Sequence, residues 1–241
     1  MSETQTTETP THTKSTQSLQ IKQSSDGKYY LQIPKHHTET ANTEIGDKIG
    51  IYPINYNGNL AISLSTNNEN GVTTKVRKDF GKETMTRVTV PKQLAVGGQL
   101  TGQQIRYNST EGGIIGIIEY EANISGTIDV YDVKEIESMT QWSNGTFPHH
   151  IDNELIDKLN IEEKLWFWYD TLGDNFVFAL ETTEENAPES AIELSIQQRH
   201  KDSARAFVFL PRKICKAMEI KGEPMKWGHN GEKILGLVEG N

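Results

Sequence analysis

A short unit that recurs along the chain constrains its fold more than any other feature. The segment TRVTVPKQL at 86–94 places Pro-Lys directly after an alternating apolar strand, and LQIPKHH at 31–37 and FLPRKICKAM at 209–218 repeat that arrangement. Around each proline the same order recurs: strand, turn, strand, short helix, strand, turn, strand. Three matches in one order predict a chain built from internal repeats.

A fourth copy is predicted where Asp152 replaces the proline. With Asp152 as the anchor, the stretch HIDNELIDKLNIEEKLWFWYDTLGDNFVFALE at 150–181 aligns with the other copies. Proline suits a first helical turn because its missing N–H would be unpaired there, and Asp suits the same boundary because its carboxylate can cap the first amides. The anchors at 34, 91, 152 and 211 are then 57, 61 and 59 residues apart. This spacing predicts four copies of one small unit.

Each copy is expected to be mainly β with one short helix. Alternation of inward Val88 with outward Arg87 and Thr89 predicts a strand, and Asn-Gly at 57–58 and at 230–231 predicts tight hairpin turns. A unit of about 45 ordered residues has too little core to be stable alone. The copies are therefore expected to pack on one another, most simply in sequential pairs.

The repeated pattern resembles a known family over nearly the whole chain after residue 17. Strand, turn, strand, [IVL]-P-[KR]-x-[LI], short helix, Gly-Asp and a closing hairpin together resemble the AbrB/SpoVT/MazE-like swapped-hairpin domain. In that family two copies, usually from two chains, interleave their hairpins into one β-barrel. Three departures are Asp152 in place of proline, Gly97-Gly98 interrupting the second helix, and a Gly-Asp step that is intact only at Gly46-Asp47.

The resemblance implies two tandem swapped-hairpin β-barrels, each built from two internal repeats. Copies one and two would form the first barrel within 18–126, and copies three and four the second within 127–241. Residues 1–17 contain seven threonines and no periodic apolar pattern, so we expect a disordered tail. Because each barrel would hold both of its repeats in one chain, a second chain is not expected to be needed for folding.

Composition limits where the chain acts. No stretch approaches the roughly 18 uninterrupted apolar residues of a membrane helix, and the first residues lack the apolar core of a signal peptide. We therefore expect a cytoplasmic protein with no membrane partner. Cys215, the only cysteine, is expected to be a small core residue on the apolar side of a helix.

Catalysis finds little support in the sequence. The paired histidines at 36–37 and 149–150 lie in no metal-ligand frame, so we expect solvated residues at strand-to-helix boundaries. The stretch EGGIIG at 111–116 is typical of a hairpin turn rather than of a phosphate-binding loop. The sequence predicts a protein that is not an enzyme and that uses no catalytic residue, metal or cofactor.

The hairpins differ in charge from the rest of the chain. The whole chain carries a net charge of -9, which argues against coating nucleic acid by bulk electrostatics. Lys and Arg minus Asp and Glu nevertheless give +2 for 18–35, +4 for 75–92 and +3 for 191–213, against -3 for 132–152. Three hairpins are thus basic and one is acidic. The cations either bind a polyanion or simply solubilise exposed edge strands.

The first functional hypothesis is a non-enzymatic, DNA-binding regulator of transcription of the AbrB-like type. The resemblance implies contacts to double-stranded DNA from the first hairpin and from the Pro-Lys corner, where arginine's planar fork suits phosphates and base edges. The candidate residues are Arg77, Lys78, Arg87, Lys92, Arg199, Lys201, Arg205, Arg212 and Lys213. The alternative is a protein-interaction or assembly module, antitoxin-like or a scaffold, that uses the same barrel with a partner protein.

Overall fold

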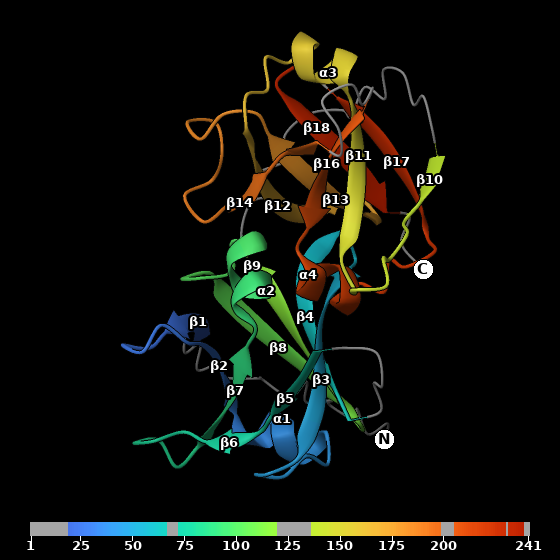
Figure 1. Cartoon of the computed structure of the whole chain (residues 1–241). Helices are drawn as coiled ribbons and strands as arrows, with labels where there is room; N and C mark the ends of the chain where they lie inside the picture. Colours follow the sequence, from blue (N-terminus) through green and yellow to red (C-terminus); the bar gives the residue numbers. More distant parts are fainter. Residues whose placement is uncertain (1–18, 67–71, 120–135, 199–204, 230, 239–241) are drawn as a thin grey trace, which may run out of the picture.

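A computed structural model describes residues 19–66, 72–119, 136–198, 205–229 and 231–238. These residues are mainly β with short helices, and Figure 1 shows two β bodies stacked end to end. The tandem-barrel fold expected from the repeats is confirmed. The predicted tail at 1–17 and the predicted join between the halves at 126–127 lie outside the described residues.

The first half is a nine-stranded sheet made from copies one and two. Its elements are β1 (Leu19–Gln23), β2 (Tyr29–Pro34), α1 (Lys35–Thr40), β3 (Lys48–Tyr56), β4 (Asn59–Ser65), β5 (Val72–Lys75), β6 (Arg77–Lys78), β7 (Met85–Val90), α2 (Lys92–Gly97), β8 (Gln104–Thr110) and β9 (Gly113–Glu119). The strand order β5-β3-β4-β9-β8-β1-β2-β7-β6 interleaves the two copies. Thr74 Oγ1 donates to the Thr89 carbonyl at 2.8 Å, which brings β5 to β7 and nearly closes the barrel.

The second half repeats this strand order. Its elements are β10 (Ile136–Ser138), β11 (Phe147–Asp152), α3 (Asn153–Lys158), β12 (Lys164–Leu172), β13 (Asn175–Glu181), β14 (Ile192–Ser195), β15 (Gln197–Gln198), β16 (Arg205–Leu210), α4 (Arg212–Ala217), β17 (Pro224–His229) and β18 (Lys233–Val238). The orders β14-β12-β13-β18-β17-β10 and β11-β16-β15 match the first half strand for strand, with a break between β10 and β11.

The strand register fits the four anchors derived from the sequence. Leu31 pairs with Val88, and His149 pairs with Val208. Each of these four residues lies three positions before its anchor, so a pseudo-twofold axis passes through each pair. All four helices begin one residue after an anchor, including α3, which begins after Asp152.

The role expected for Asp152 as a helix cap is wrong. Its side chain makes no capping hydrogen bond to the first amides of α3. Instead Asp152 Oδ1 forms an ion pair with Arg205 Nε at 2.8 Å. The physical reason is the pairing of β11 with β16, which sets Asp152 directly opposite Arg205. A cross-strand charge pair therefore replaces the expected cap.

The Gly97-Gly98 step, which departs from the family pattern, lies where the two halves meet. Helices α2 and α4 pack against each other between the barrels, and α1 and α3 lie at the outer ends (Figure 1). A Cβ on Gly97 would lie 2.8 Å from Ile214 Cδ1, and one on Gly98 would lie 2.6 Å from the Tyr169 hydroxyl oxygen. These glycines let the α2 backbone approach the second half, so one hydrophobic core runs through both halves.

A second contact between the halves joins two hairpin turns. Asn55 Nδ2 donates to the Gly173 carbonyl at 2.8 Å, and Thr171 Oγ1 donates to the Gly58 carbonyl at 3.1 Å. The β3–β4 and β12–β13 turns therefore bind each other through side-chain to backbone hydrogen bonds. The two halves are therefore joined by hydrogen bonds as well as by the packing of α2 on α4.

Two single-residue predictions had different outcomes. Cys215 is buried, as expected, and burial raises the pKa of its thiol well above the usual value. His149, expected to be solvated, is buried and stacks on Trp227 with ring centroids 3.6 Å apart. It points inward because it occupies the β11 position equivalent to Leu31.

No helix among the described residues has the length and hydropathy needed to cross a membrane.

Candidate nucleic-acid interface

A groove of about 580 Å³ opens on the first half, where the two interleaved hairpins meet. Its walls come from the β1–β2 turn and from strands β2, β3, β5, β6 and β7. The lining residues are Ser24, Asp26, Lys28, Tyr29, Tyr30, Lys48, Thr73, Thr74, Lys75, Arg77, Arg87 and Thr89. Five of these side chains are cationic and one is acidic, so the groove carries a net charge of +4.

Two pairs of like charges lie directly opposite each other across the strands of the groove. Lys48 pairs with Lys75 between β3 and β5, and Arg77 pairs with Arg87 between β6 and β7. Like charges at such positions destabilise a sheet. Among the described residues, none of these four cations forms an ion pair with a carboxylate. Within the described part of the chain, these four charges are therefore not neutralised by an ion pair.

Aromatic rings hold the guanidinium of Arg87 at the groove wall. Its Cζ lies 5.9 Å from the ring centroid of Tyr30 and 5.0 Å from that of Phe80. Both are cation–π distances, which orient the planar fork without neutralising its charge. Arg87 is thus a fixed donor group at the groove wall.

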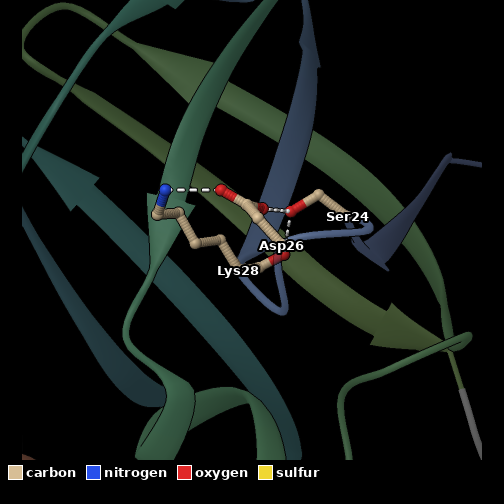
Figure 2. Close-up of polar contacts among 3 residues, drawn as sticks. All are labelled: Ser24, Asp26 and Lys28. Carbon is tan, nitrogen blue, oxygen red and sulfur yellow. Dashed lines mark hydrogen bonds and ion pairs between the residues drawn. The ribbon is translucent and has the colours of Figure 1, made fainter.

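The single acid of the groove is held by its own hairpin turn (Figure 2). Lys28 Nζ lies 2.5 Å from Asp26 Oδ2, and the Ser24 hydroxyl donates to Asp26 Oδ1. Hydrogen bonds from Lys28 and then from Ser24 lower the pKa of Asp26 from 3.8 to about 2. Asp26 therefore stays ionised, and its carboxylate neutralises part of the positive charge of Lys28.

Two of the seven described residues expected to contact DNA line the groove. Arg77 and Arg87 both line the groove, whereas the exposed Lys78 does not. Lys78 follows Arg77 directly on β6, and successive strand residues point to opposite faces. Lys92 is exposed at the start of α2, outside the groove lining.

The candidates of the second half are arranged differently. Arg205 forms the ion pair with Asp152, and Arg212 and Lys213 are exposed at the start of α4. Arg199 and Lys201 lie outside the described residues. The described candidates of this half do not join the groove.

Three cations of the groove escaped the sequence reasoning. Lys28 contributed to the +2 charge of the first hairpin, but nothing singled it out. Lys48 and Lys75 belong to different copies and meet only because β3 pairs with β5. A repeat alignment treats the copies separately, so it does not reveal a pairing between them.

The equivalent face of the second half is aromatic. Counting from the anchors, Phe207 and Phe209 of β16 occupy the positions of Arg87 and Thr89 of β7. Trp142 packs on both, with ring centroids 5.5 Å and 5.4 Å away. An apolar cluster thus replaces Arg87 and Thr89, and Gln197, which pairs with Phe207, takes the place of Arg77. The described residues of this face therefore lack the opposed arginines of the first half.

Metal-ligand chemistry is not built into the described part of the chain. No group of three or more His, Cys, Asp or Glu side chains there is arranged to hold a metal ion. His37 Nδ1 lies 2.8 Å from Ser109 Oγ, and burial followed by the charge of His36 lowers the pKa of His37.

No protein-family model, curated protein or solved structure matches this chain.

Proposed function

We propose that this chain binds double-stranded DNA through the basic groove of its first half and acts as a non-enzymatic regulator of transcription of the AbrB-like type. The observation that carries the proposal is the pair of like-charged contacts, Lys48 opposite Lys75 and Arg77 opposite Arg87. Each costs stability in the free protein. A ligand with regularly spaced negative charges offsets that cost when it binds.

The other groove residues suit a phosphate backbone. Thr73 and Thr89 supply hydroxyl groups, and Tyr30 supplies an aromatic face beside Arg87. Hydroxyl donors and basic side chains make most contacts to phosphate and sugar in protein–DNA complexes. Arginine adds a planar fork that also reads guanine edges in the major groove.

The acidic character of the whole chain supports a localised interface. A net charge of -9 repels a polyanion from most of the surface, whereas the groove carries +4. The resulting field orients DNA toward one face during encounter. The aromatic face at the same place in the second half favours one DNA-binding half and one half with another role.

Charge reversal at two matched places tests the proposal. Arg77→Glu with Arg87→Glu changes the groove, and Arg212→Glu with Lys213→Glu makes the same change in net charge on α4. Binding of a labelled duplex is measured by fluorescence anisotropy over a salt series. We expect the groove variant to bind at least about tenfold more weakly and to lower the salt slope by about two units.

The α4 variant is expected to keep most of the affinity. Equal losses in both variants would show attraction by bulk charge and contradict a groove-specific site. If the unmodified chain binds no duplex at low salt, where electrostatic binding is strongest, the proposal fails. A protein-interaction or assembly module then becomes the better explanation of the barrel.

A further inference from the structure

An exposed aromatic ring stands beside the basic groove. Phe80 is 82% exposed, and among the described residues only Ile45 is another exposed large hydrophobic side chain. A single exposed apolar residue is ordinary on a protein surface. The position of Phe80 is what gives it meaning, because its ring centroid lies 5.0 Å from the guanidinium carbon of Arg87, a groove residue.

The backbone that carries Phe80 is anchored to the barrel. The preceding residue, Asp79, is buried and accepts a hydrogen bond from Gln32 Nε2 at 2.5 Å. Further along the turn, Lys35 N donates to the Thr84 carbonyl at 2.9 Å. Phe80 therefore extends from a turn that is tied to β2 before it and to the first residue of α1 after it. A ring on such a rigid support loses little conformational entropy when it binds a flat group.

The ring and the guanidinium form a continuous edge to the groove. Arg87 lies over the Phe80 ring and also near Tyr30, so three planar groups follow one another from the groove wall to its rim. A phosphate chain in the groove would place its attached bases within reach of that rim. Stacking on an aromatic side chain is the sequence-tolerant way in which proteins hold unpaired bases.

We propose that Phe80 stacks on a nucleobase of the nucleic acid that binds the groove. The inference rests on the proposed function, because the phosphates in the groove bring the base to the ring. A base exposes its face for stacking either in a single strand or at a base step of a duplex that an apolar side chain has wedged open. In either case Phe80 selects nucleic acids over polyanions that have no bases.

Three substitutions at one position separate stacking from general hydrophobic contact. Phe80→Ala removes the ring, Phe80→Leu keeps apolar volume without a flat face, and Phe80→Trp keeps a flat face. Each variant is titrated with a duplex, with one of its single strands and with heparin, which is a polyanion without bases. Thermal melting of each variant confirms that the exposed position leaves the fold unchanged.

We expect Phe80→Ala and Phe80→Leu to bind nucleic acid about tenfold more weakly and heparin unchanged, with Phe80→Trp close to the unmodified chain. A loss on the single strand alone identifies unpaired bases as the ligand, and a loss that extends to the duplex identifies a wedge. The tryptophan fluorescence of the unmodified chain is subtracted from that of Phe80→Trp to isolate the signal of the new side chain. That signal should fall when the nucleic acid binds.

Three outcomes would overturn the inference while leaving the proposed function intact. These are DNA binding unaffected by Phe80→Ala, an equal loss for heparin and DNA, or a Phe80→Leu variant that binds like the unmodified chain. Failure of the proposed function has a different signature, in which the unmodified chain does not bind the duplex.

Discussion

The Tyr169 hydroxyl donates a hydrogen bond to the Leu94 carbonyl oxygen at 3.0 Å and so ties the second half to helix α2 of the first. Tyr169 is fully buried, and burial raises the pKa of its hydroxyl well above the usual value, so the group remains a donor at physiological pH. The contact exists because Gly98 leaves room for the ring. The junction of the halves thus depends on the absence of a side chain.

Gly98→Ala should destabilise the protein by about 1–3 kcal/mol, the typical cost of overpacking a core. Gly98 is the C-cap of α2 with φ -91°, an angle open to alanine, so in free space the same change would stabilise the fold and the sign of the effect is diagnostic. Gly113→Ala is the control, because its added Cβ would meet nothing closer than 3.7 Å. Chemical denaturation measures both variants. Equal stability of the two would contradict a tight junction at Gly98.

Asp152→Pro should leave the free energy of unfolding unchanged or raise it by up to about 1 kcal/mol. Asp152 has φ -67°, which matches the value that proline imposes, and proline occupies the other three anchors. The lost ion pair with Arg205 is partly exposed and contributes little. Thermal unfolding checks the variant, and a loss above about 2 kcal/mol would show that Asp152 is not equivalent to the prolines.

His149→Leu should reduce the amount by which the free energy of unfolding falls as the pH is lowered. Burial, and then the charge of His150, lowers the pKa of His149 from 6.5 to about 3 in the folded protein. Between these pH values only the unfolded chain binds the proton, so stability falls as pH falls from 6.5 toward 3. The contribution is at most about 1.4 kcal/mol per pH unit.

The comparison of the unmodified chain with His149→Leu isolates that contribution, since leucine occupies the equivalent position 31. Urea unfolding at a series of pH values provides the measurement. We expect the two stability curves to diverge below pH 6.5 and to run parallel above it. Curves parallel throughout would place the acid sensitivity elsewhere.

Asp26→Asn should strengthen DNA binding about two- to fivefold, which is the range expected for one exposed charge contact. The change removes the only acid among the described residues that line the groove, and it releases Lys28 from its ion pair. Asp174→Asn makes the same change in net charge in an exposed turn of the second half and serves as the control. Weaker binding by Asp26→Asn would mean that Asp26 orders the hairpin for the ligand.

The fold could be predicted because its determinants repeat in sequence. The strand-to-helix corner recurs every 57 to 61 residues, with proline at three anchors and Asp152, which fits the same φ angle, at the fourth. The pairing of β2 with β7 and of β11 with β16 follows once two copies share one barrel. Alternation within each strand then determines which residues face the core.

The groove could be predicted only in part. Arg77 and Arg87 were found because they lie in one charged hairpin, but Lys48 meets Lys75 through contacts between copies. Lys78, also predicted to contact DNA, lies outside the groove lining, since local charge counting ignores the alternation of strand faces. Gly97-Gly98 was interpreted as a weak helix, because sequence propensity contains no information about what packs against the helix.

The pseudo-twofold axis between Leu31 and Val88 has a consequence for the kind of target site. It relates Arg87 to Tyr30 and Thr89 to Gln32, so the two repeats do not present the same side chains around the axis. Two identical subunits would present the same side chains twice and would favour palindromic half-sites. If the first half binds DNA as proposed, the arginine on one side of the axis and the tyrosine on the other give the barrel a polarity, which suits sites that read differently in the two directions.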